Sequence, residues 1–186
     1  MQTLELPKIN SCSVAVIGMG YVGLPLAIEI AKSDSCLLTK QKLNREVLGY
    51  DINESRIEDL KKGIDINNIF SKEIFSNIKN ISFTTNKFLL RDIDVFIITV
   101  PTPINKKNEP ALKQLELASK VVGESIRDRS SDKCNPIIIF ESTVFPGASE
   151  EIFMPIISSF SGLPIYDDTN NKKSLAFGYS PERINP

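Results

Sequence analysis

The chain has 186 residues, of which 41% are hydrophobic and 24% are charged, so it is long enough to form one domain around an apolar core. Its 22 basic and 23 acidic side chains give a formal net charge of −1, which argues against a general binder of nucleic acid or of an anionic membrane surface. Histidine is absent from the sequence, which excludes imidazole as a catalytic base or zinc ligand, and we predict no metal site.

Cysteine usage and the amino terminus indicate the compartment of the protein. Cys12, Cys36 and Cys134 are widely spaced and form no C-x-x-C pair, which is typical of reduced thiols rather than of a disulfide framework. Residues 1–11 contain no apolar segment of the kind found in signal peptides, and no apolar run approaches the roughly 20 residues that span a bilayer. We therefore expect a cytoplasmic protein without a membrane segment.

Short apolar runs and amphipathic stretches alternate along the chain. The apolar runs predict strands at 13–17, 46–51, 81–84, 94–100, 136–140 and 175–179. Helical patterns lie between most of them, at 23–32, 54–62, 71–78, 112–127 and 147–159. Such alternation predicts parallel strands joined by right-handed crossovers. We expect residues 1–186 to form one α/β domain of the Rossmann type, a doubly wound parallel sheet with helices on both faces.

A glycine-rich turn, G-M-G-Y-V-G, follows the first predicted strand and precedes the first helix. In the dinucleotide-binding fingerprint, Gly18 allows the tight turn, Gly20 lets the backbone approach a pyrophosphate, and Gly23 lets the helix pack closely on the strand. The helix N-terminus then offers free N–H groups and a positive dipole end to the phosphates. The alternative is a glycine-rich turn without a ligand.

An acidic residue at the end of the second strand should hold the adenosine ribose, and Asp51 stands there. Its carboxylate would repel a 2′-phosphate, which favours NAD over NADP, although nearby Arg56 argues in the other direction. We expect Arg56 to pack beside the adenine or to reach a phosphate. Asp51 follows Gly23 by 28 positions instead of about 20, so we interpret residues 33–44 as an insertion, in its simplest form a surface extension.

Five motifs now follow one another in order: G-M-G-Y-V-G-L-P-L-A, G-Y-D-I-N, V-P-T-P, E-S-T-V-F-P-G and G-Y-S-P-E-R-I-N-P. Together they resemble the N-terminal half of the UDP-glucose/GDP-mannose dehydrogenase family, and most closely its branch that acts on UDP-N-acetyl-hexosamines for bacterial surface polysaccharides and capsules. The resemblance implies a double oxidation of the sugar C6 alcohol to a carboxylate, with two NAD and a covalent thioester.

The resemblance also implies which residues contact the cofactor. These are Gly18, Gly20, Tyr21, Val22, Gly23, Asp51, Arg56, Thr102 and Thr143. Thr102 and Thr143 would reach it from the carboxyl ends of the fourth and fifth strands, where ligands of such sheets bind. The alternative for these two threonines is turn chemistry beside a proline.

Residues near the end of the chain match the substrate side of the family. Glu182 matches an acid near the reacting carbon, and Arg183 and Ile184 match positions that contact the UDP-sugar. Without the resemblance, Glu182 and Arg183 would be a solvated charged pair. We expect Glu141 near the nicotinamide, and its alternative is a structural hydrogen-bonding role.

The catalytic machinery implied by the family is incomplete in these residues. Its nucleophilic cysteine and catalytic lysine belong to later segments, and Cys12, Cys36 and Cys134 match no such motif. We therefore expect a fragment that binds NAD but is inactive alone, and a full-length protein that is a homodimer. Two alternatives stay open: a UDP-glucose or GDP-mannose dehydrogenase, and a dinucleotide-binding module without chemistry.

Overall fold

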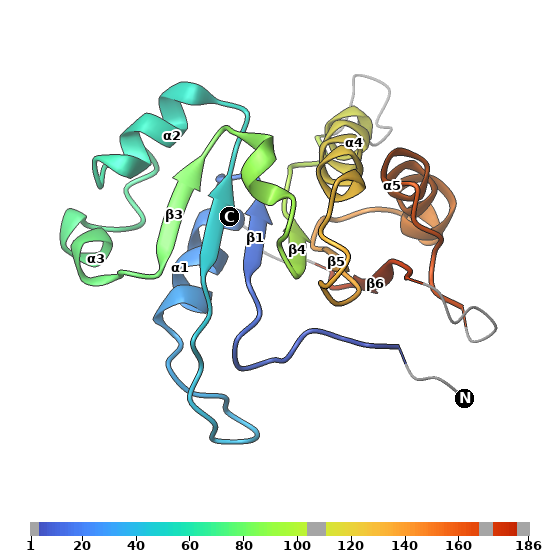
Figure 1. The fold of residues 1–186 in the computed structure, drawn as a ribbon. Coiled ribbons are helices and arrows are strands. Elements are labelled where there is room, and N and C mark those ends of the chain that lie inside the picture. Colours follow the sequence, from blue (N-terminus) through green and yellow to red (C-terminus); the bar gives the residue numbers. More distant parts are fainter. Residues whose placement is uncertain (1–3, 104–110, 168–172, 182–186) are drawn as a thin grey trace.

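A computed structural model of the chain describes residues 4–103, 111–167 and 173–181. Its centre is a sheet of six parallel strands in the order β3-β2-β1-β4-β5-β6 (Figure 1). The strands are β1 Val14–Ile17, β2 Val47–Tyr50, β3 Ile81–Thr84, β4 Val95–Ile98, β5 Ile137–Phe140 and β6 Ala176–Tyr179. At the carboxyl end of β1, Ile17 stands opposite Tyr50 and Ile98. This strand order is that of doubly wound dinucleotide-binding domains, so the predicted Rossmann-type α/β sheet is confirmed.

Helices cover both faces of the sheet, as predicted (Figure 1). The helices are α1 Gly23–Lys32, α2 Glu54–Lys61, α3 Lys72–Asn77, α4 Lys113–Arg127 and α5 Met154–Ser161. Side chains alternate along β1: Val14 and Val16 pack with α1 and α2 on one face, whereas Ala15 and Ile17 pack with α4 and α5 on the other. The sheet is therefore buried on both sides, and only its edges and strand ends remain for a site.

Local signals account for most element boundaries. The side chain of Asn53 accepts a hydrogen bond from the Arg56 N–H over 3.1 Å and caps α2. Two short elements differ from the prediction: a 3-10 turn, η1 Lys87–Leu90, and a π turn, η2 Ser149–Phe153, at the start of the helix expected at 147–159. Pro155 has no N–H to complete the α-helical pattern there, which is a physical reason for the wider turn.

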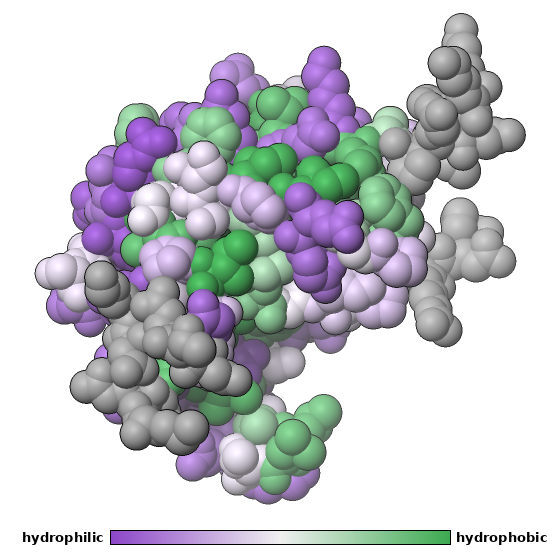
Figure 2. Space-filling model, turned by 90° about the vertical axis from the view of Figure 1, so that its right-hand side faces the viewer, coloured by the Kyte–Doolittle hydropathy of each residue, from purple (hydrophilic) through white to green (hydrophobic). Residues whose placement is uncertain are grey.

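The predicted insertion, residues 33–44, lies at the amino-terminal end of the sheet and projects from the molecule (Figures 1 and 2). A bridge between Ser35 and Lys42 closes it into an antiparallel loop. Leu37 and Leu38 at its tip are 84% and 92% exposed. The pKa of the Cys36 thiol is lowered to about 7. The largest cause is a hydrogen bond from the Thr39 side chain, and hydrogen bonds from the backbone N–H groups of Thr39 and Leu38 contribute less. Among the helices that the model describes, none is long and apolar enough to cross a bilayer.

Candidate functional site

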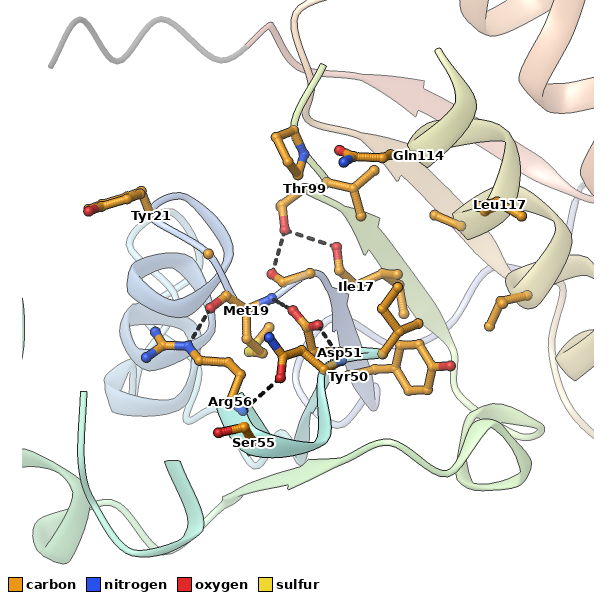
Figure 3. A pocket seen from close by; sticks show the side chains of 18 of the residues that line it. Ile17, Met19, Tyr21, Tyr50, Asp51, Ser55, Arg56, Thr99, Gln114 and Leu117 are labelled. Atoms are coloured by element: carbon orange, nitrogen blue, oxygen red, sulfur yellow. Dashed lines mark hydrogen bonds between the residues drawn. The ribbon is translucent and has the colours of Figure 1, made fainter. Parts of the chain in front are cut away.

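A cavity of about 460 Å³ opens at the carboxyl ends of β1, β2 and β4. It lies where the strand order reverses between β1 and β4, the position at which open α/β sheets bind their ligands. The glycine-rich turn, the start of α2, the segment after α2, the end of β4 and one side of α4 line it (Figure 3). The cavity therefore gathers segments from three crossovers, those that follow β1, β2 and β4, around one space.

The three glycines of the turn differ in what requires them. Gly18 has a φ of +103°, a conformation that side chains rarely adopt, and a β-carbon at Gly23 would overlap the carbonyl oxygen of Gly18 and the hydroxyl of Thr99. At Gly20, in contrast, a β-carbon would meet no protein atom within 4 Å. Gly20 also lines the cavity, so the backbone there is open on a side that no side chain of the protein fills. This arrangement fits the close approach of a pyrophosphate to the turn.

Thr99 fixes the turn from the neighbouring strand, a role that the sequence analysis missed. Its hydroxyl lies 3.0 Å from the carbonyl oxygen of Ile17 and 2.9 Å from that of Gly18, and it can donate to either (Figure 3). The sequence did contain a signal for this role: a threonine stands in an apolar predicted strand, and a buried hydroxyl needs a hydrogen-bond partner.

Asp51 joins the end of β2 to the turn. Its carboxylate accepts hydrogen bonds from the backbone N–H of Met19 over 2.7 Å and from that of Asn53 over 2.9 Å (Figure 3). A carboxylate offers about four lone-pair positions. Asp51 also lines the cavity, so its remaining lone pairs are available to hydroxyl donors there.

Arg56 lines the same cavity but is anchored within the protein. The residue is 6% exposed; its Nε donates to the Met19 carbonyl oxygen over 2.9 Å, and its Nη2 lies 2.9 Å from an oxygen of Asp65. Within the described residues, Nη1 is buried without a hydrogen-bond partner, and Nη2 has no partner beyond its ion pair with Asp65. Burial raises the pKa of Asp65, but hydrogen bonds from Arg56 and from backbone N–H groups outweigh this and hold that pKa below its ordinary value. The sequence analysis missed Asp65, because its partners are known only from the fold.

The other predicted cofactor residues lie around or beside the cavity. Tyr21 lines its rim with a 69% exposed side chain that points away from the interior (Figure 3). Val22 is the residue immediately before α1, and it does not line the cavity. Thr102 donates from its hydroxyl to the Thr143 carbonyl oxygen over 2.8 Å, so the two threonines lie together, next to the cavity rather than in its wall.

On the substrate side, little of the predicted set falls in the described part of the chain. Glu141 directly follows β5, and its backbone N–H donates to Ile98 at the end of β4 over 2.9 Å. Glu182, Arg183 and Ile184 lie outside the described residues. Within the described ranges, no group of three or more histidine, cysteine, aspartate or glutamate side chains is arranged to hold a metal ion.

Helix α4 supplies an apolar wall that the sequence analysis did not assign to the site. Leu117 and Val121, four residues apart, line the cavity together with Gln114 (Figure 3). Leu117 is 50% exposed, unlike the buried Leu115 that packs on the sheet. The sequence signal for this wall was a second apolar stripe on the helix, Leu117 and Val121, beside the stripe that packs on the sheet. The site thus combines a polar turn at a helix N-terminus with apolar walls, which suits a ligand that carries both phosphate and planar rings.

Comparisons with known proteins agree with this geometry. Residues 12–186 match the family model of the NAD binding domain of the UDP-glucose/GDP-mannose dehydrogenase family. The chain is 39% identical to UDP-N-acetyl-D-glucosamine 6-dehydrogenase of Salmonella typhi and 42% identical to that of Pseudomonas aeruginosa, over 96% of this chain and 36% and 37% of the relatives. The solved structure of UDP-D-ManNAc dehydrogenase from Pyrococcus horikoshii is similar with a TM-score of 0.71, at 29% identity over 94% of this chain and 37% of that one. The chain thus spans little more than a third of the length of these proteins.

Proposed function

Because the chain belongs to the UDP-glucose/GDP-mannose dehydrogenase family and forms its NAD-binding domain, we propose that it serves an NAD-dependent nucleotide-sugar 6-dehydrogenase. The substrate in this proposal is a UDP-N-acetyl-hexosamine, whose C6 alcohol is oxidised to a uronate for surface polysaccharide or capsule. The names of the relatives at 39% and 42% identity favour this sugar class. The complete enzyme is expected to work as a homodimer.

The observation that carries the proposal is the open space at Gly20 beside the cavity. The N-terminus of α1 and the backbone of the turn would bind the pyrophosphate there. Bound NAD supplies a hydride acceptor for the sugar carbon. Asp51 would accept hydrogen bonds from the adenosine ribose hydroxyls and repel a 2′-phosphate, which favours NAD over NADP. Gln114, Leu117 and Val121 would cover the cofactor from α4 and exclude water.

The residues assigned to the reacting end rest on their motifs. Thr102 and Thr143, held together by one hydrogen bond at the strand ends, would contact the cofactor beside the nicotinamide. Glu182 would assist proton transfer or hydrolysis, and Arg183 and Ile184 would contact the UDP-sugar. Glu141 would lie near the nicotinamide.

Turnover by the product of the whole gene tests this proposal. The enzyme is mixed with NAD and, separately, with UDP-GlcNAc, UDP-GalNAc, UDP-ManNAc, UDP-glucose and GDP-mannose, and NADH absorbance is followed. We expect NADH with at least one UDP-N-acetyl-hexosamine, at two NADH per sugar, and far slower reaction with UDP-glucose and GDP-mannose. Faster turnover of either of those two would assign the protein to another branch, and absence of turnover with every sugar would contradict the dehydrogenase.

The same assay compares the activity of this chain with that of the full-length protein. The chain of 186 residues should bind NAD without forming NADH from any of these sugars, because hydride transfer requires the sugar carbon to be held against the nicotinamide by a facing wall. Sustained turnover by this chain alone would show that the catalytic groups lie within it.

A further inference from the structure

Asp65 organises the segment between α2 and α3. The residue is 5% exposed, and its carboxylate accepts hydrogen bonds from the backbone N–H groups of Asn67 over 3.1 Å, Ile69 over 3.0 Å and Phe70 over 3.3 Å. The segment therefore folds around this one carboxylate. Two of its residues, Ile66 and Asn67, line the cavity.

The same carboxylate connects this segment to the glycine-rich turn. Asp65 lies 2.9 Å from Nη2 of Arg56, and Nε of Arg56 donates to the Met19 carbonyl oxygen over 2.9 Å. The side chains of this ion pair are 6% and 0% exposed, so each depends on the other to remain charged in the interior. Without Asp65, Arg56 would lose the partner that holds its guanidinium in this orientation.

The peptide between Met19 and Gly20 is the target of this connection. Asp51 accepts from the Met19 N–H, and Arg56 donates to the Met19 carbonyl, so the residue is held from both sides. The described residues contain no cis peptide bond, and in a trans peptide the carbonyl and the following N–H point in opposite directions. Fixing the Met19 carbonyl on Arg56 therefore fixes the direction of the Gly20 N–H, at the glycine that faces the cavity.

We propose that Asp65 is a positioning residue for the dinucleotide: through Arg56 it sets the orientation of the Met19–Gly20 peptide, and through its own backbone contacts it holds Ile66 and Asn67 as one wall of the cavity. This inference rests on the proposed binding of NAD. In this proposal Asp65 does not touch the cofactor. Its role explains why a carboxylate is buried after α2, outside the glycine-rich turn itself.

A double-variant cycle on the 186-residue chain tests the proposal, with NAD affinity measured by calorimetry. We expect Asp65→Asn to weaken NAD binding by about tenfold or more, because small misplacements of binding groups carry large penalties. In an Arg56→Met background, the same substitution should weaken NAD binding by a clearly smaller factor, because its route to the turn is already removed and only its hold on Ile66 and Asn67 remains. Equal effects in both backgrounds, or no effect in either, would overturn the proposal.

Asp92→Asn is a control with the same kinds of hydrogen-bond donor, at a carboxylate that is 30% exposed where that of Asp65 is 0% exposed. Asp92 also accepts from a backbone N–H, that of Ser130 over 2.9 Å, and from an arginine, Arg91 over 3.1 Å, but it does not line the cavity. Its variant should keep the NAD affinity of the parent within about twofold. If Asp92→Asn weakened NAD binding as much as Asp65→Asn, a general loss of stability would explain both results and the positioning role would be rejected.

A second readout needs no cofactor and separates this inference from the proposed function. Amide hydrogen exchange in the NAD-free protein should become faster in Asp65→Asn at residues 18–22 as well as at 66–70, and stay unchanged there in Asp92→Asn. Should Asp65→Asn fail to fold, Arg56→Lys replaces it, since one ammonium cannot reach both Met19 and Asp65. A parent that does not bind NAD refutes the proposed function, whereas unchanged exchange at residues 18–22 refutes the positioning role.

Discussion

The first and third glycines of the turn lie so close together that a β-carbon at Gly23 would overlap the carbonyl oxygen of Gly18. The same β-carbon would meet the hydroxyl of Thr99, which is held by the carbonyl groups of Ile17 and Gly18. The obstructing atoms are backbone and a buried side chain, so they have little freedom to move. Gly23 is therefore required by the packing of α1 against the sheet, with or without a ligand.

This contact predicts a large loss of stability for Gly23→Ala. The free energy of unfolding should fall by about 3 kcal/mol or more, at the upper end of the cost of overpacking. Urea denaturation followed by circular dichroism measures it. Gly20→Ala, at a position open to the cavity, is the control and should stay within about 0.5 kcal/mol of the parent. A Gly23→Ala protein as stable as the control would show that the turn is not packed as described.

Cofactor preference should depend on the charge of Asp51. Asp51→Asn keeps an oxygen that can accept from Met19 but removes the charge that, in the proposed binding mode, would face a 2′-phosphate. The ratio of NAD to NADP affinity should fall by about tenfold or more, since a hydrogen bond to a charged group contributes about 1.5–3 kcal/mol. Calorimetric titration with both cofactors measures the ratio. Glu54→Gln, which removes a charge from the first turn of α2 outside the cavity, should leave it unchanged. An unaltered ratio in Asp51→Asn would give the preference to Arg56 instead.

The thiols of Cys36 and Cys12 should ionise at different pH values. Hydrogen bonds from Thr39 and Leu38 lower the pKa of Cys36 to about 7, so its thiolate forms as the pH rises through that value, whereas burial raises the pKa of Cys12. The ultraviolet absorbance of thiolate, recorded as the difference between the parent and Cys36→Ser, should titrate with a midpoint of about 7. Thr39→Val removes the largest contribution and should move the midpoint upward. A midpoint at the ordinary thiol value of about 8.5 would contradict the geometry of the loop.

The sequence predicted the architecture well because its signals are local. The apolar runs, the glycines after β1 and the Asn53 cap each act within a few residues, and the alternation of strands and helices indicates a parallel sheet. The motif residues Gly18, Gly20, Asp51 and Arg56 also proved to lie around one cavity. Their individual roles toward the cofactor remain predictions.

What the sequence did not predict depends on distant contacts. Asp65 and Arg56 pair across a turn and nine positions, and Thr99 reaches Gly18 across 81 positions. Neither pair follows from periodicity or motif spacing. The apolar wall of α4 was missed for another reason: Leu117 reads as a solvent-facing residue until the cavity beside it is known.

Binding of NAD at the glycine-rich turn can be tested with a single substitution, Gly20→Val. A valine side chain there would meet no protein atom near its β-carbon, but it would enter the space assigned to the pyrophosphate. Calorimetric titration of the parent and of this variant with NAD, with urea denaturation of both, is the decisive measurement. We expect equal stability within about 0.5 kcal/mol and NAD binding that is weaker by about tenfold or more in the variant. A variant that folds and binds NAD with the affinity of the parent would contradict it.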